Sequence, residues 1–170
     1  AIRQSLREGG VAPSEVGIGE CHGTATALGD PIEIGALSAA LGGARREKPL
    51  LLGAAKSNIG HLEGGAGIVG LTKLVAMVRT RNMPSTVHLR ELNDHIAEDL
   101  EDFAASFPTE NTKLAAKAPI TASVSSFGFG GTNGHVAIQS AERKVSASPK
   151  PKRVVMLFTG QGSQYAGMGK

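Results

Sequence analysis

The sequence is poor in cysteine and in aromatic side chains: its 170 residues include one cysteine, no tryptophan and one tyrosine. A single cysteine excludes an internal disulfide and is typical of a reducing compartment, so we expect a cytoplasmic protein. The scarcity of aromatic residues argues against base stacking and therefore against nucleic acid as a partner. No apolar run approaches the length that crosses a bilayer, so we expect no membrane span.

Positive charge is concentrated in one stretch of the chain. The formal net charge is +3, and basic residues gather in the Pro/Ser/Ala-rich segment 141–153, which we interpret as a linker. A nucleic-acid footprint spread over a folded face is therefore not expected. The apolar run 154–158 after this segment predicts a new strand and the beginning of a second domain.

Common nucleotide and metal motifs are missing or misplaced. The sequence contains no G-x-x-x-x-G-K-[ST], which excludes a P-loop. Gly65, Gly67 and Gly70 spell G-x-G-x-x-G, but the segment KSNIGHLE separates them from the preceding strand, which the dinucleotide fingerprint follows directly. The H-x-E formed by His61 and Glu63 lacks the partner motifs of zinc sites, so we expect no metal.

What the chain does contain is an alternation of apolar strands, polar turns and helices. Its apolar pattern predicts a helix over 1–9, strands over 16–20 and from Leu50, and helices over 30–42 and up to Arg79. This order is typical of βαβ units in a largely parallel sheet. The last helix begins in a Gly/Ala-rich stretch of poor helix propensity, so we expect close packing of its start on a sheet or a neighbouring subunit.

The helix over 30–42 has a well-marked start. Asp30 is the predicted N-cap residue, Pro31 occupies the first helical position and Glu33 completes an approximate capping box. Asp30 and Glu33 are therefore expected to have structural roles at this helix start.

The C-terminal part of the chain predicts a closing pair of strands. Segments 120–127 and 136–138 are apolar enough for two antiparallel strands, joined by the Gly-rich loop SSFGFGGTNGH. Between residues 83 and 112 the pattern weakens and predicts irregular surface structure with one short strand near Phe103. We interpret the acidic run 91–102 as a solvated face.

Two histidines follow the ends of the first two predicted strands. His22 comes directly after strand 16–20, and His61 lies in the turn after the strand that begins at Leu50. Both turns are expected at one edge of the sheet, where open α/β folds keep their chemistry. Two neutral imidazoles that point their N–H groups at one place would stabilise a developing oxyanion. Lys56 is expected either to hold His61 in its donor tautomer or to keep a neighbouring group charged.

The remaining cysteine and histidines have simpler interpretations. Cys21 neighbours His22, but adjacent residues at a strand end point to opposite sides, so a packed side chain is expected rather than a nucleophile. His88, His95 and His135 have no partner pattern and are expected to be structural or exposed.

Three ordered blocks of the sequence match one enzyme family. ECHGTATALGDPIE, KSNIGHLEGGAG and SSFGFGGTNGHV resemble the conserved blocks of β-ketoacyl synthases. Together with PSTVHLRELN, they look most like the C-terminal half of the ketosynthase domain of a type I polyketide synthase, over residues 1–140. The segment FTGQGSQYAGMG resembles the first strand and loop of an acyltransferase domain, so 154–170 would be the truncated start of that domain after the 141–153 linker.

The resemblance implies both a fold and a reaction. The fold would be a thiolase-like layered α/β fold, of which this chain is the incomplete C-terminal βαβαβαββ half. The reaction would be decarboxylative Claisen condensation of a malonyl-type extender, held by acyl carrier protein, with an acyl thioester. No cofactor would be bound directly, since the phosphopantetheine arm of the carrier protein brings the substrate. The family also implies a homodimer.

Roles for individual residues follow from the same resemblance. His22 and His61 would stabilise the enolate of decarboxylation, with Lys56 supporting His61. Phe129 would gate the site, and its backbone N–H would help to bind the acyl oxyanion. The other positions implied to contact substrate are Thr24 and Thr26, for the phosphopantetheine arm, together with Asn58 and Gly128.

The sequence departs from the family pattern at several positions. The T-A-C-S-S block that holds the nucleophilic cysteine is missing from these residues, and Cys21 stands where the family usually has alanine. Ala25 replaces a usual glycine, and Gly134 replaces a usual alanine. The fragment alone is therefore not expected to be active, and half of such a fold is expected to expose a large apolar face.

Two alternative functions stay open at this point. One is the ketosynthase of a type I fatty acid synthase. The other is a non-catalytic, chain-length-factor-like dimer partner, which the missing cysteine block suggests. A thiolase is disfavoured because its second catalytic cysteine lies in the closing Gly-rich loop, and segment 125–135 contains none.

Overall fold

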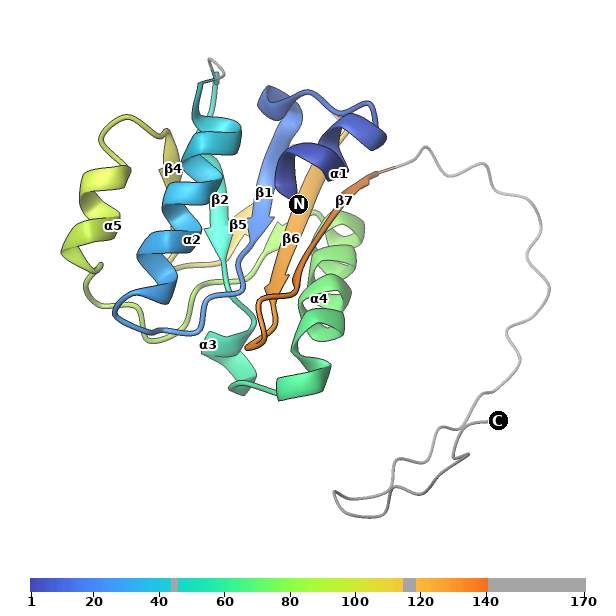
Figure 1. The fold of residues 1–170 in the computed structure, drawn as a ribbon. Coiled ribbons are helices and arrows are strands. Elements are labelled where there is room, and N and C mark those ends of the chain that lie inside the picture. The colour runs from blue at the N-terminus through green and yellow to red at the C-terminus, as the bar shows by residue number, and fades with distance from the viewer. Residues whose placement is uncertain (44–45, 115–118, 141–170) are drawn as a thin grey trace, which may run out of the picture.

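A five-stranded sheet forms the centre of the computed structural model, which describes residues 1–43, 46–114 and 119–140 (Figure 1). The strand order is β4-β2-β1-β6-β7; only β7 is antiparallel to its neighbour. Because β2 and β6 flank β1 on opposite sides, the strand order reverses at β1, which is where open α/β sheets form their sites. The strands are β1 (Val16–Glu20), β2 (Leu50–Gly53), β4 (Ala105–Ser106), β6 (Thr121–Phe127) and β7 (Asn133–Gln139).

Helices cover both faces of this sheet. Figure 1 shows α2 and α4 on opposite sides of the strands, with α5 beside α2. The helices are α1 (Ile2–Glu8), α2 (Gly29–Leu37), α3 (Lys56–Ile59), α4 (Ala66–Thr80) and α5 (Asp94–Asp99). Short turns complete the framework: η1 (Pro13–Glu15), the π-helical η2 (Ser38–Gly42) that continues α2, and η3 (Glu63–Gly65) before α4. The two-residue strands β3 (Asn82–Met83) and β5 (Thr112–Lys113) pair separately.

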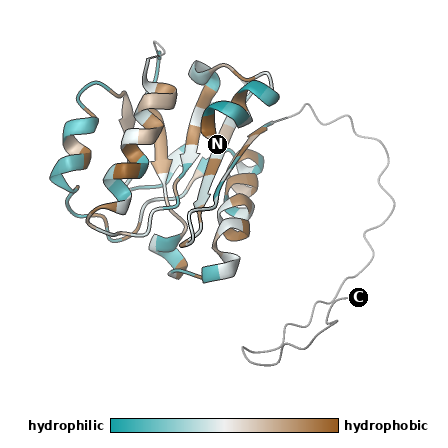
Figure 2. Ribbon diagram, viewed as in Figure 1, coloured by the Kyte–Doolittle hydropathy of each residue, from teal (hydrophilic) through white to brown (hydrophobic). Residues whose placement is uncertain are grey.

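Two apolar clusters, one on each face, hold the layers together. Leu37 of α2 and Phe103 belong to the cluster on the first face, and Leu74 and Met77 of α4 belong to the cluster on the other. Burial of such side chains contributes about 1.5–3 kcal/mol each. Figure 2 shows hydrophobic colouring on parts of β1, β2, α2 and α4. The central strands of the sheet are thus largely buried on both faces, as parallel strands require, while the edge strand β7 stays partly exposed.

The structure confirms the predicted order of elements and the closing hairpin. Strand, turn, helix, strand, turn, helix runs from β1 to α4, and β6 pairs antiparallel with β7. The predicted short strand near Phe103 is β4, two residues further on. The prediction of irregular surface structure between residues 83 and 112 was wrong in part, because this segment also contains the helix α5. Asn93 caps that helix by accepting the backbone N–H of His95 at 3.0 Å.

The predicted capping box at the start of α2 is wrong. The helix begins at Gly29 with Leu28 in the capping position and no side-chain cap. The Asp30 carboxylate instead accepts the backbone N–H of Ala25 at 3.1 Å, and Glu33 turns toward the end of β1. Both carboxylates therefore hold the turn that precedes the helix, because that turn has backbone N–H groups that α2 itself cannot satisfy.

Glycines let the start of α4 approach the sheet closely. A Cβ atom at Gly67 would lie 2.9 Å from the Ser126 hydroxyl, and one at Gly70 would lie 3.1 Å from Val124. The predicted close packing of this Gly-rich stretch on a sheet is confirmed.

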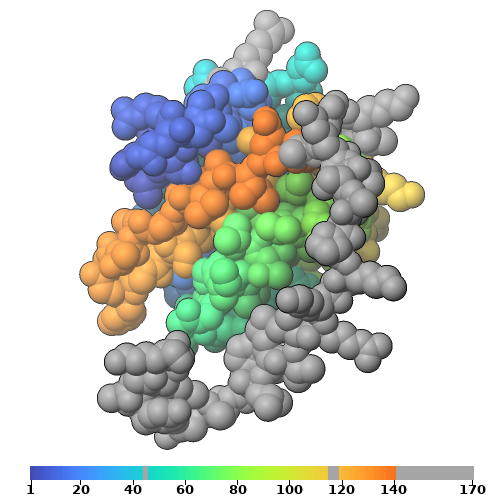
Figure 3. All heavy atoms as spheres, turned by 90° about the vertical axis from the view of Figure 1, so that its right-hand side faces the viewer, coloured from blue at the N-terminus to red at the C-terminus, as the bar shows by residue number. Residues whose placement is uncertain are grey.

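One outer face exposes apolar side chains on several elements. Figure 3 shows α1, β7 and α4 side by side across this face. Ile68 and Val75 of α4 and Val136 of β7 are exposed. Leu28 and Ile32 at the start of α2, on the other side of the sheet from α4, are exposed as well. No helix in the described parts of the chain is long and apolar enough to cross a membrane. The predicted linker 141–153 and the strand 154–158 lie outside the described residues.

Candidate active site

The two histidines meet at the carboxyl edge of the sheet. His22 follows the end of β1, and His61 follows β2 and the short helix α3. Their ring centroids lie 5.8 Å apart, and the ring planes are perpendicular. The predicted approach of the two imidazoles to one place is therefore confirmed.

His22 is held by groups from three other elements. Its backbone N–H donates to Glu33 Oε1 at 2.7 Å, and its carbonyl accepts from the Lys56 ammonium at 2.5 Å. Its Nδ1 accepts the backbone N–H of Phe127 at 3.4 Å, and the Lys56 ammonium lies at the same distance from Nδ1. Because both neighbours are donors, Nδ1 is the unprotonated nitrogen, and we assign the proton of the neutral ring to Nε2.

Electrostatics keep the His22 ring neutral. Burial lowers its pKa, and the positive charge of Lys56 and the proximity of His61 lower it further. A ring with a lowered pKa stays uncharged near neutral pH, so it offers Nε2–H as a hydrogen-bond donor.

His61 adopts the same tautomer by a simpler route. Its Nδ1 accepts the backbone N–H of Glu63 at 2.9 Å, within its own turn. The side chain is exposed at the site. The neutral ring therefore also carries its proton on Nε2, so both histidines can present Nε2–H donors.

The expected pairing of Lys56 with His61 is corrected by the structure. Lys56 begins the helix α3 rather than lying in a loop, and its ammonium reaches back to His22. This direction follows from the sheet, since β1 and β2 are neighbours and the start of α3 lies beside the end of β1. Burial lowers the pKa of Lys56.

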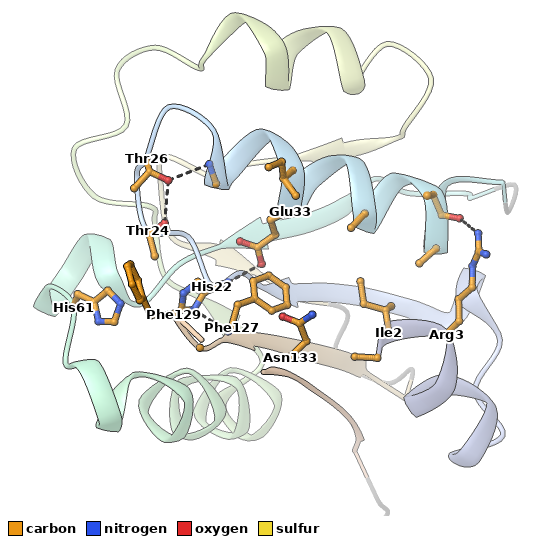
Figure 4. Close-up of a pocket in the computed structure, with 17 residues that line it drawn as sticks. Ile2, Arg3, His22, Thr24, Thr26, Glu33, His61, Phe127, Phe129 and Asn133 are labelled. Carbon is orange, nitrogen blue, oxygen red and sulfur yellow. Dashed lines mark hydrogen bonds between the residues drawn. The ribbon is translucent and has the colours of Figure 1, made fainter. Parts of the chain in front are cut away.

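A cavity of about 1000 Å³ opens onto the two imidazoles (Figure 4). His22, His61, Phe127 and Phe129 lie at one end of it, and Ile2 and Arg3 lie at the other (Figure 4). The cavity wall also includes the small side chains of Ala36 in α2 and of Ala39 and Ala40 in η2.

Four of the predicted substrate-binding residues line this cavity: Thr24, Thr26, Gly128 and Phe129. The Thr26 hydroxyl accepts the backbone N–H of Gly29 at 3.0 Å, which fixes the threonine turn at the start of α2. The Phe129 ring is fully exposed. Asn58 is not among the described residues that line the cavity; its side chain accepts the Ser57 hydroxyl at 3.4 Å within α3.

Glu33 has a larger structural role than its expected place in a capping box. Its second oxygen accepts the backbone N–H of Gly23 at 2.9 Å, so one carboxylate binds two successive amides of the His22 turn. Burial raises the pKa of Glu33 to about 7, although both hydrogen bonds act to lower it.

Several residues near the site were not predicted from the sequence. Phe127 contacts His22 in two ways: the centroids of the two rings lie 5.4 Å apart, and the backbone N–H of Phe127 donates to Nδ1 of His22. Glu20 and Lys73 form an ion pair of 2.8 Å beneath the site. A charged residue at the end of the apolar strand VGIGE was the one signal for Glu20.

The residues set aside behave largely as expected. Cys21 is buried in the apolar cluster under α2, and burial raises the pKa of its thiol well above its ordinary value, so it is a packed side chain. His95 is exposed. His135 is partly buried and lies 3.0 Å from the Ser125 hydroxyl through its Nδ1; burial lowers the pKa of His135 to about 4.

Family models match along most of the chain. The model "Beta-ketoacyl synthase, C-terminal domain" matches residues 1–90, and "Ketoacyl-synthetase C-terminal extension" matches residues 93–170. The chain therefore belongs to the β-ketoacyl synthase family. The second match also runs across 154–170, where the start of an acyltransferase domain was predicted; that assignment stays a prediction.

Curated relatives narrow the class to polyketide synthases. The chain is 45% identical over 140 residues to polyketide synthase ThaG of Burkholderia thailandensis, covering 81% of this chain and 2% of ThaG. It is 43% identical over 148 residues to erythronolide synthase EryA2 of Saccharopolyspora erythraea, covering 86% of this chain and 4% of that protein. This chain thus corresponds to the C-terminal part of a polyketide synthase ketosynthase domain, and it spans a small share of such relatives.

Solved ketosynthase domains share the fold. The oxazolomycin ketosynthase domain OzmH KS7 of Streptomyces albus matches with a TM-score of 0.76 and 35% identity, over 83% of this chain and 25% of that one. Ketosynthase twelve of the bacillaene polyketide synthase from Bacillus amyloliquefaciens matches with a TM-score of 0.77 and 31% identity, over 83% and 25%. The predicted thiolase-like α/β fold, present here in part, is confirmed.

Proposed function

We propose that this chain supplies the enolate-stabilising half of a ketosynthase active site in a polyketide synthase. The reaction is the decarboxylative Claisen condensation of a malonyl-type extender with an acyl thioester. The observation that carries the proposal is the pair of imidazoles 5.8 Å apart, each with Nδ1 occupied by a donor and Nε2–H free to face substrate.

The chemistry assigned to these groups is stabilisation of negative charge. When the malonyl carboxylate leaves as CO₂, the electron pair of the broken C–C bond passes into the thioester and forms an enolate. Nε2–H of His22 and of His61 donate to the enolate oxygen, which lowers the barrier. The enolate carbon then attacks the carbonyl carbon of the acyl thioester and forms a new C–C bond. The C–S bond of that thioester breaks, and its electron pair leaves with the thiolate.

Lys56 acts on this reaction through His22. Its ammonium fixes the carbonyl and Nδ1 of His22, which orients Nε2–H toward the cavity. The positive charge also disfavours protonation of the ring, so His22 stays a neutral donor. Lys56 is in this sense a positioning residue for His22.

The remaining roles come from the resemblance to ketosynthases. Thr24 and Thr26 bind the phosphopantetheine arm of acyl carrier protein at the cavity, and Phe129 gates it, with its backbone N–H and Gly128 beside the acyl oxyanion. Their place along the cavity wall supports these roles. We extend the proposal to a homodimer, a cytoplasmic protein and an acyltransferase domain that begins near residue 154, after the 141–153 linker.

The fragment by itself is proposed to be inactive, because the T-A-C-S-S block is not in its sequence. The test therefore uses the full-length protein. His61→Ala should reduce release of CO₂ from malonyl-carrier protein by about 10²–10³-fold, as loss of one oxyanion donor typically does. His95→Ala, which changes an exposed histidine on α5, is the matched control. Undiminished CO₂ release from the His61→Ala protein would refute the proposal.

A further inference from the structure

β1 ends in a buried carboxylate that the reaction does not use. Glu20 lies two residues before His22 and is 2% exposed. Its Oε2 pairs at 2.8 Å with the ammonium of Lys73, which comes from the middle of α4. Gly70, one turn earlier on α4, also lies beside Glu20, since a Cβ there would be in ordinary contact with Glu20 Cγ at 3.5 Å.

The same carboxylate also binds the segment that carries Lys56. Glu20 Oε1 accepts the backbone N–H of Ala55, the residue directly before Lys56. In the opposite direction, the Lys56 ammonium donates to the backbone carbonyl of His22 at 2.5 Å. The end of β1 and the start of α3 are thus joined twice, once by a side chain from each.

This double connection links α4 to the imidazole. Lys73 fixes Glu20, Glu20 fixes the backbone at Ala55, and that backbone sets where the Lys56 side chain begins. A buried carboxylate without its cation would be costly, so Lys73 is what allows a charged acceptor at this position.

We propose that the Glu20–Lys73 ion pair is a positioning device that holds the Lys56 ammonium against His22. The inference rests on the proposed function, since Lys56 and His22 act there. Glu20 and Lys73 do not touch substrate; they act through the backbone at Ala55 and the side chain of Lys56.

The pKa of His22 reports where Lys56 lies. The charged and titratable groups around His22 are Lys56 from α3, the neighbouring His61, and the Glu33 carboxylate from α2 at its backbone N–H. Those around Glu20 are Lys73 from α4 and Lys56. After burial, Lys56 is the largest cause of the lowered pKa of His22, so displacement of its ammonium should raise that pKa.

The test replaces both charges of the pair at once. In the full-length protein, Glu20→Gln combined with Lys73→Met removes one negative and one positive charge, so net charge is unchanged and no buried charge is left without a partner. Carbethoxylation of His22 by diethyl pyrocarbonate is followed against pH by peptide mass spectrometry. We expect the midpoint for His22 to rise by about half a pH unit or more toward its ordinary value.

Matched variants control for charge and for folding. Arg79→Met removes an exposed cation from the same helix and should leave the midpoint unchanged. Lys73→Arg keeps the ion pair and should retain the wild-type midpoint. Lys73→Gln is a second variant that breaks the ion pair but keeps a hydrogen-bond donor beside Glu20, and it should raise the midpoint in the same direction as the double variant does. An unchanged His22 midpoint in both the double variant and Lys73→Gln overturns the inference.

The readout is independent of catalysis. Carbethoxylation measures the imidazole itself, so it remains valid if His61→Ala leaves decarboxylation intact and the proposed function fails. With the proposed function correct, the double variant should also lose about tenfold in CO₂ release, as expected when a donor is displaced but not removed.

Discussion

The two histidine turns reach the same point by different means. The His22 turn is bound from outside: Glu33 holds its amides, Lys56 its carbonyl and Phe127 its ring nitrogen. The His61 turn is organised locally, since its ring nitrogen accepts an amide two residues further along the chain. One imidazole is therefore positioned by tertiary contacts and the other by local backbone conformation.

This difference predicts where substitutions will matter. Changes around His22 should propagate to the site even when they lie on another helix, because that is where its partners are. Changes around His61 should be tolerated unless they alter the turn itself. The following predictions test this contrast in the full-length protein, beginning with the largest effect.

The largest difference between the two turns is expected when the glutamate of each turn is replaced, because only Glu33 binds amides of its turn through its carboxylate. Glu33→Ala leaves the partly buried N–H groups of His22 and Gly23 without an acceptor, which should cost about 3 kcal/mol of stability. Displacement of His22 should also lower CO₂ release by about 10²-fold. Glu63→Ala is the matched change in the other turn; it keeps the backbone N–H that His61 accepts, so both quantities should remain near wild type. Equal losses in stability and CO₂ release for the two variants would break the contrast.

The His22 turn should also make stability depend on pH. Burial raises the pKa of Glu33 from 4.5 to about 7, so the folded protein binds more protons between these values than the unfolded chain does. The contribution of Glu33 to stability is therefore fully present below pH 4.5 and is lost as pH rises through 7, by about 3 kcal/mol in total. Calorimetric unfolding from pH 4.5 to 8 should show this decline relative to Glu33→Gln. Parallel profiles for the two proteins would contradict it.

Glycine-to-alanine substitutions should also lower the free energy of unfolding by different amounts in the two turns, with a smaller difference than that between the glutamate variants. Gly23 has φ of +51°, and a Cβ there would lie 2.5 Å from Ala54 Cβ, so Gly23→Ala should cost about 2–3 kcal/mol. Gly64, three residues after His61, has open space around its Cβ position. Gly64→Ala should therefore change the unfolding free energy by no more than about 0.5 kcal/mol. Similar midpoints of chemical denaturation for both variants would argue against the difference in packing.

The smallest expected effect is a gain. Ala25 lies in the His22 turn with φ of +58°, which costs an alanine about 1–2 kcal/mol. Ala25→Gly removes this strain, and after the larger entropy loss of glycine on folding it should stabilise the protein by about 0.5 kcal/mol. A lower thermal midpoint for Ala25→Gly would show that the alanine side chain makes a compensating contact.

The fold was more predictable from the sequence than the contacts of the site. Strands β1 and β2 and helix α4 follow from their apolar patterns, because each buries several apolar side chains in the core. The helix α5 was missed because its apolar signal is short, with Ile96 its one buried residue. The capping box failed because Asp30 and Glu33 bind the preceding turn, a competing use of the same carboxylates that the local sequence does not distinguish.

The sequence by itself determined which residues stand at the ends of β1 and β2, and therefore that His22, Lys56 and His61 share one edge. This follows from the alternation of strands and helices in βαβ units, which brings the carboxyl ends of parallel strands together. Only the tertiary structure decided that Lys56 faces His22 rather than His61, and that Lys73 pairs with Glu20. Partner choice depends on how neighbouring strands and helices are placed in space, and separation along the chain carries no information about that placement.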